Sequence, residues 1–160
     1  MRNVRLAFLG AALLGGAAVP ALASPSDFLT KALKGDNSEA KLGAYAAANG
    51  RSAKVREFGA MLAQDHRKAR QQTIPIAAKY HVAVPSQMAP EAQLEYAKLH
   101  LLSGAKFDRE FGRYMVKDHQ TDIADFEKEA KSRDPSDLRA LATRTLPVLR
   151  KHLATARSIG

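Results

Sequence analysis

The sequence has no cysteine and no tryptophan among its 160 residues. The absence of cysteine excludes disulfide bonds, thiolate metal ligands and a cysteine nucleophile. The Gly-x-Ser-x-Gly motif of serine hydrolases and the glycine-rich loops that bind phosphate are absent as well. None of these motifs therefore indicates a catalytic class, and stability must come from packing of the chain or from a bound ion.

Strand signals are also scarce, because the chain lacks alternating runs of Val, Ile and Thr between turn residues. Apolar residues instead recur at helical spacing. Ser26 and Ser52 are predicted to cap the first two helices, and Pro75 and Pro147 are expected to kink the helices that contain them. Five helices are predicted, at about 26–49, 53–80, 90–102, 105–132 and 135–156.

Only one stretch is long and apolar, and it lies at the N-terminus. A basic segment, Met1–Arg5, precedes the apolar run Leu6–Leu22, which ends in the small-x-small pattern Ala21-Leu22-Ala23. This pattern is typical of a secretory signal peptide. Glycines and a proline within the run disfavour the alternative, an uncleaved membrane anchor. We therefore predict a signal peptide at residues 1–23, a single domain at 24–160, export to the periplasm or cell envelope, and no membrane insertion of the mature protein.

Positive charge exceeds negative charge, with a formal net charge of +9. Phe and Tyr together make up only 6% of the residues, and they are not interleaved with basic clusters as a nucleic-acid stacking surface requires. We interpret the charge as a solvated surface with weak affinity for anionic envelope components. Nucleic acid is not expected as a partner.

A short pattern occurs twice in the chain. Glu57-Phe58-Gly59 precedes Asp65-His66, and Glu110-Phe111-Gly112 precedes Asp118-His119, with eight residues from Phe to His in both. The copies fall on the second and fourth predicted helices. Two helical hairpins related by a pseudo-twofold axis would produce this repetition. The predicted fold is therefore all-α, a ferritin-like up-down four-helix bundle with one additional short helix.

Helical spacing places several polar side chains on the apolar faces of the long helices. Carboxylates that face a bundle core need a metal ion, an Arg or Lys, or a histidine to neutralise them. His119 and Asp122 have the i, i+3 spacing that lets two side chains reach one ion. The predicted metal ligands are Glu39, Asp65, His66, Asp118, His119, Asp122 and His152, with Asp65 and Asp118 as ligands or as acceptors that orient the imidazoles. Such nitrogen and oxygen donors suit zinc, iron, manganese or copper(II).

Two other interpretations stay open. The inward polar residues can pair among themselves without a metal ion. The protein would then be a structural or stress-related adaptor of the envelope, which binds envelope components or self-associates. A di-metal enzyme is disfavoured, because the Glu-x-x-His motif of di-iron oxidases is absent. We therefore predict no catalytic residues and do not expect an enzyme.

Several motifs in order resemble one bacterial exported family, domain of unknown function 4142, over about residues 27–157. The segments that show this resemblance are Ser38–Gly43, Met61–His66, Leu102–Asp108, Met115–His119 with Asp122, Phe126–Ala130 and Leu146–Leu153. The resemblance implies a ferritin-like bundle in the cell envelope and no established activity. Lys41 departs from the family pattern, where an acidic residue is common.

Overall fold

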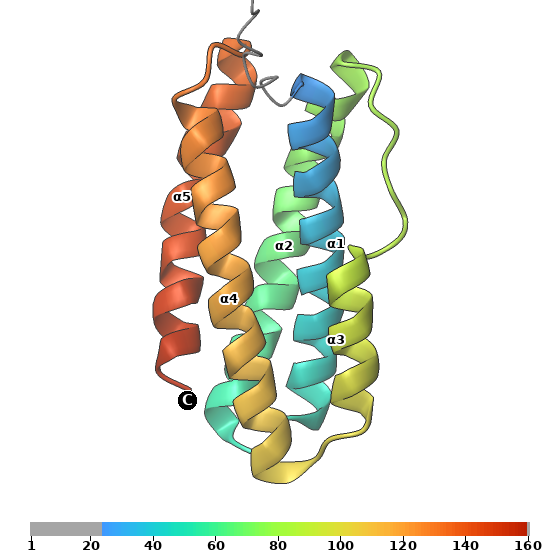
Figure 1. Cartoon of the computed structure of the whole chain (residues 1–160), viewed down its shortest axis with the longest axis vertical. Coiled ribbons are helices and arrows are strands. Elements are labelled where there is room, and N and C mark those ends of the chain that lie inside the picture. The colour runs from blue at the N-terminus through green and yellow to red at the C-terminus, as the bar shows by residue number, and fades with distance from the viewer. Residues whose placement is uncertain (1–23, 160) are drawn as a thin grey trace, which may run out of the picture.

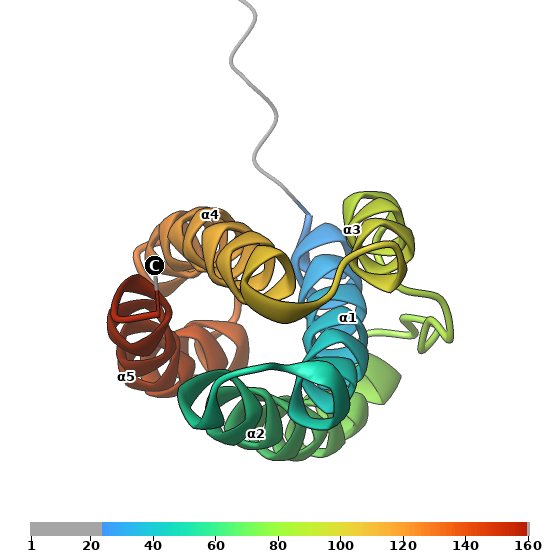
Figure 2. The same cartoon turned by 90° about the horizontal axis from the view of Figure 1, so that it is seen from below.

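The computed structural model describes residues 24–159, which form five helices and no strand. The helices are α1 (Pro25–Asn49), α2 (Ala53–Lys79), α3 (Pro90–His100), α4 (Gly104–Ala130) and α5 (Ser136–Arg157). Four long helices enclose the core and α3 lies outside them, so the predicted all-α bundle is confirmed (Figures 1 and 2). The predicted signal peptide lies outside the described residues. None of the described helices is long and apolar enough to span a bilayer.

The long helices form two hairpins, α1 with α2 and α4 with α5. The segment between α2 and α4 contains α3 and runs the length of the bundle (Figure 1). Consequently α2 and α4 run in the same direction, as do α1 and α5. In cross-section the order around the core is α1, α2, α5, α4, so that α2 and α4 lie diagonally opposite each other (Figure 2). A single long crossover of this kind is typical of ferritin-like bundles.

The first helix begins earlier than predicted. Ser24, not Ser26, is the N-cap: its hydroxyl accepts a hydrogen bond from the backbone N–H of Asp27, whose carboxylate accepts one from the backbone N–H of Ser24. Pro25 then occupies the first helical position, where its missing N–H leaves no hydrogen bond unmade. This reciprocal capping box satisfies two backbone donors, whereas a cap at Ser26 would leave Pro25 outside the helix.

Other boundaries lie within two residues of the prediction. Ser52 caps α2 by accepting a hydrogen bond from the backbone N–H of Val55. The third helix ends at His100, two residues earlier than predicted. Neither Pro75 in α2 nor Pro147 in α5 ends its helix.

Close packing of α1 on α2 holds the first hairpin together. A Cβ added to Gly59 would lie 2.6 Å from the carbonyl oxygen of Gly43, so the two backbones approach where neither residue has a side chain. Further along the core, the rings of Phe58 and Phe111 pack edge to face with centroids 5.9 Å apart. Tyr45 stacks on His100, which attaches α3 to the outside of α1. Packing at these contacts fixes the helices whose inner faces carry the polar residues.

Candidate metal centre

Three histidines from three long helices converge in the middle of the bundle. His66 lies on α2, His119 on α4 and His152 on α5, and their exposed fractions are 4%, 0% and 0%. The ring centroids are 6.0 Å apart for His66 and His119, and 5.3 Å for each of the other two pairs. One donor nitrogen from each ring lies within 4.8 Å of those of the other two. The helices thus bring together three imidazoles that are far apart in the sequence.

Each imidazole is oriented by a partner on its outer side. Nδ1 of His66 lies 3.0 Å from a carboxylate oxygen of Asp36, and Nε2 of His152 lies 3.0 Å from a carboxylate oxygen of Asp65. Nδ1 of His119 lies 3.0 Å from the carbonyl oxygen of Met115, one turn earlier in α4. A proton on each of these nitrogens would satisfy all three contacts and leave the opposite nitrogen of each ring as a base.

The opposite nitrogens have no hydrogen-bond partner among the described residues. They are Nε2 of His66, Nε2 of His119 and Nδ1 of His152, and all three are buried. A buried polar atom without a partner costs about 1–3 kcal/mol of folding free energy. Such atoms in one cluster can bind a metal ion through their lone pairs, which at Nε2 of His66 requires loss of a proton, because Glu39 and Asp36 raise the pKa of this ring.

Glu39 of α1 completes the cluster from the fourth long helix. Its side chain is 1% exposed, and its oxygens lie 2.9 Å from Nε2 of His66 and 3.2 Å from Nδ1 of His119. Neither contact has hydrogen-bond geometry, so both oxygens of Glu39 are held by ion-pair contacts and make no hydrogen bond. Glu39, Asp118 and His119 also form a second group whose donor atoms lie within 4.8 Å of one another. The two groups share His119, which places nitrogen and carboxylate donors around one region.

Charge within the cluster is carried mainly by one pair. Burial opposes ionisation of Glu39, but the positive charges that His119 and His66 carry at low pH outweigh it and lower the pKa of Glu39 to about 2. Burial would lower the pKa of His66, but Glu39 and Asp36 raise it well above its usual value. The metal-free protein therefore holds an imidazolium–carboxylate pair between α1 and α2.

The other two imidazoles are neutral near pH 7. Burial lowers the pKa of His119, and it lowers that of His152 to about 4. Burial and the charge of Glu39 raise the pKa of Asp118 to about 9 and that of Asp122 well above its usual value. Asp118 therefore stays protonated near pH 7, because burial and the charge of Glu39 outweigh the opposing charge of His66.

Of the predicted ligands, five lie together and two lie beside them. Glu39, Asp118 and the three histidines form the two groups described above. Asp65 contacts His152 from the partly exposed outer side. Asp122 belongs to neither group and lines a cavity instead. The i, i+3 spacing of His119 and Asp122 therefore does not bring these two to one point, since Asp118, next to His119, takes that place.

Asp36 was missing from the predicted ligands although helical spacing places it on the inward face of α1. It is buried and holds the ring of His66. Its separation of three residues from Glu39 puts both carboxylates on one face of α1, which is the signal that could have identified it.

Comparisons with known proteins identify a family and a fold. The family described as "Domain of unknown function (DUF4142)" matches residues 12–159. A solved structure, the crystal structure of a DUF305 fragment from Deinococcus radiodurans, is similar with a TM-score of 0.73 and 19% sequence identity. The similarity covers 86% of this chain and 96% of that one. None of the curated proteins matches the sequence significantly.

Proposed function

The chain belongs to the DUF4142 family, whose description gives no function, and we propose that it binds one transition-metal ion in the middle of its bundle. His66, His119, His152 and Glu39 are the proposed ligands, and Asp118 is the adjacent carboxylate that can join them. Asp36, Asp65 and the carbonyl group of Met115 hold the imidazoles in place. Binding, and not catalysis, is the proposed activity.

The observation that carries this proposal is that the two nitrogens of each imidazole have different surroundings. One nitrogen of each ring contacts an outer oxygen acceptor, and the other is buried without a hydrogen-bond partner. Metal-binding histidines have this arrangement, because the outer acceptor fixes the tautomer and directs the free lone pair to the ion. Nitrogen donors about 2.1 Å from one ion are roughly 3.4 Å apart. Atoms now within 4.8 Å of one another reach that geometry through shifts of less than about 1 Å.

The donor set favours particular ions. Three imidazoles with one carboxylate suit zinc and copper(II) best, and iron or manganese less well. Calcium and magnesium prefer oxygen donors and are not expected. We propose that the ion is bound outside the cytoplasm, which rests on the predicted signal peptide at residues 1–23. N-terminal sequencing of the protein recovered from its native host tests this, with Ser24 expected as the first residue.

Metal analysis of the protein, purified without a histidine tag, tests the proposal. After incubation with zinc or copper(II) and removal of free ions, we expect one equivalent of bound metal. Changing His66 and His119 together to Gln should remove it, because two nitrogen donors are lost. Changing the exposed His81 to Asn is the control, since Asn tolerates the backbone φ of 55° at this position. Less than about one-tenth of an equivalent in the unchanged protein would contradict the proposal.

One observation favours a second function, a structural or adaptor role in the envelope. The pair formed by His66 with Asp36 and Glu39 neutralises charge without an ion. If this pair alone neutralises the buried charge, the core needs no metal ion. The function would then lie in the surface, which would bind envelope components or a second copy of the chain. Unchanged metal content and unchanged phenotype in the double His-to-Gln variant would support this role over metal binding.

A further inference from the structure

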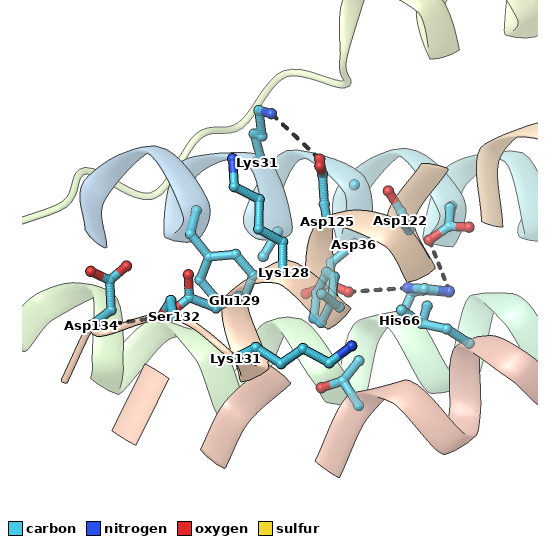
Figure 3. A pocket seen from close by; sticks show the side chains of 17 residues that line it. Lys31, Asp36, His66, Asp122, Asp125, Lys128, Glu129, Lys131, Ser132 and Asp134 are labelled. Carbon is cyan, nitrogen blue, oxygen red and sulfur yellow. Dashed lines mark hydrogen bonds and ion pairs between the residues drawn. The ribbon is translucent and has the colours of Figure 1, made fainter. Parts of the chain in front are cut away.

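A cavity of about 390 Å³ reaches the candidate metal centre from one side of the bundle. The buried side chains of Glu39 and His66 line its inner end. Its outer end is lined by Lys31 and Asp125, which form a solvent-exposed ion pair (Figure 3). Asp122 lies between the two ends (Figure 3). The centre is therefore connected to the surface through space bounded by side chains of all four long helices.

Carboxylates follow this cavity along one face of α4. Asp118, Asp122, Asp125 and Glu129 are spaced by four, three and four residues, which places them in one row along the helix. The row spans about 16 Å at a rise of 1.5 Å per residue. Its last three members line the cavity, and its first belongs to the group of Glu39 and His119. Carboxyl oxygens that could bind a cation thus extend from the cavity mouth to the proposed ligands, and Lys31, Lys128 and Lys131 also line the cavity.

The inner end of the cavity presents buried polar atoms that make no hydrogen bond. Both carboxylate oxygens of Glu39 and Nε2 of His66 are buried without a hydrogen bond, and both residues line the cavity. The cavity wall opposite Asp122 is kept open by Gly35, where an added Cβ would meet only an oxygen of Asp122, at 3.8 Å. A cation that enters the cavity can pass Gly35 and meet Glu39 and His66 at its end, an ion pair in which Nε2 of His66 and both oxygens of Glu39 make no hydrogen bond.

We propose that this cavity is the passage by which a divalent transition-metal ion reaches the histidine centre, with Asp122 as a temporary ligand on the way. This inference rests on the proposed function, because it requires an ion to be bound at the centre. The ion exchanges some of its waters for the carboxylate of Asp122 and then transfers to Glu39 and the imidazoles. Asp122 leaves the ion at that point, which accounts for its place outside both donor groups.

Kinetics of cobalt(II) uptake by the full chain test the role of Asp122. Cobalt(II) stands in for zinc, and its visible absorption bands report coordination by protein ligands in a stopped-flow experiment. We expect Asp122→Asn to slow uptake by about tenfold, because an amide cannot give up a proton to become the anionic oxygen ligand that takes the ion from water. The final absorbance and the bound equivalents should not change. Glu127→Gln is the control, since it makes the corresponding acid-to-amide change on α4 outside the cavity, and its uptake rate should stay within twofold.

A second pair of variants tests the passage itself. Gly35→Leu should place a side chain in the cavity and slow both uptake and chelator-driven release, because an ion must leave by the way it entered. Gly35→Ala adds only one methyl group in ordinary contact and should leave both rates within twofold of the unchanged protein.

The results of these experiments distinguish failure of the proposed passage from failure of the proposed metal centre. Unchanged rates in Asp122→Asn and Gly35→Leu, with metal bound normally, would overturn the passage and leave the proposed metal centre standing. Loss of bound metal in Asp122→Asn would make Asp122 a permanent ligand and overturn its temporary role. Absence of metal in the unchanged protein would overturn the proposed function, and the passage with it.

Discussion

His66 and His119 occupy equivalent positions on two parallel helices, and their ring centroids lie 6.0 Å apart across the bundle core. Phe58 and Phe111, eight residues earlier on the same helices, meet in the same way at 5.9 Å. An approximate twofold axis along the bundle relates α2 to α4 and α1 to α5. The same axis pairs Asp65, which contacts His152 of α5, with Asp118, which groups with Glu39 of α1. The candidate centre thus lies where two similar hairpins face each other.

Bound metal should stabilise the fold. A ligand present at about a hundred times its Kd and specific for the folded state adds about 2.7 kcal/mol. For a domain of this size the Tm should rise by about 10 °C when zinc is added to chelator-treated protein. Magnesium at the same concentration is the control and should leave Tm unchanged, since imidazole-rich sites bind it poorly. A zinc response equal to the magnesium response would contradict specific binding.

Asp65→Ala should weaken metal binding without unfolding the protein. The carboxylate holds Nε2 of His152 at 3.0 Å, and the side chain of Asp65 is 34% exposed. Removal of such an outer partner typically lowers metal affinity by about 10- to 100-fold. Competition with a chelator of known affinity measures the change, and Glu57→Ala, an exposed acid on the same helix, is the control. Equal affinities in the two variants would show that Asp65 does not orient His152.

Gly59→Ala should destabilise the bundle by about 2 kcal/mol. The added Cβ would lie 2.6 Å from backbone atoms of Ala47 and Gly43, so α1 and α2 would have to separate. A gain in helix propensity of about 0.5–1 kcal/mol does not offset this. Gly35→Ala is the control with the same propensity gain and no clash, and it should be neutral or slightly stabilising. Urea denaturation of chelator-treated protein compares them, and equal midpoints would contradict the close approach of these helices.

Glu95→Gln should raise stability at alkaline pH only. Burial and the charge of Glu110 raise the pKa of Glu95 to about 7, and its Oε1 has no partner. Between about pH 4.5 and 7 the folded state therefore binds more protons at this residue than the unfolded state, so its contribution to stability falls as pH rises.

The variant removes this loss, so at pH 8 it should be more stable than the unchanged protein by about 1–2 kcal/mol. Near pH 4 the two proteins should have similar stability. Thermal melts at both pH values measure the difference, with the exposed Glu91→Gln on the same helix as control. A stability gain of the same size at pH 4 would assign the effect to packing and not to the charge of Glu95.

Much of the fold follows from local signals in the sequence. Helical spacing of apolar residues and the cap at Ser52 predicted all five helices. The repeated Phe and His positions predicted two related hairpins, and the related residues do meet. The cap at Ser24 was missed, because a reciprocal box with Asp27 outweighs a single serine two residues later.

The sequence by itself determined which side chains face the core, because a period of 3.6 residues assigns each residue to one side of its helix. It thereby placed three histidines and several carboxylates inside the bundle. Only the tertiary structure decided which of them meet: Asp36 with His66, Asp65 with His152, and Asp122 with the cavity in place of the centre. The reason is physical, since the axial offset and rotation of each helix depend on packing contacts such as Gly43 on Gly59, and shifts of a few ångströms there exchange one partner for another.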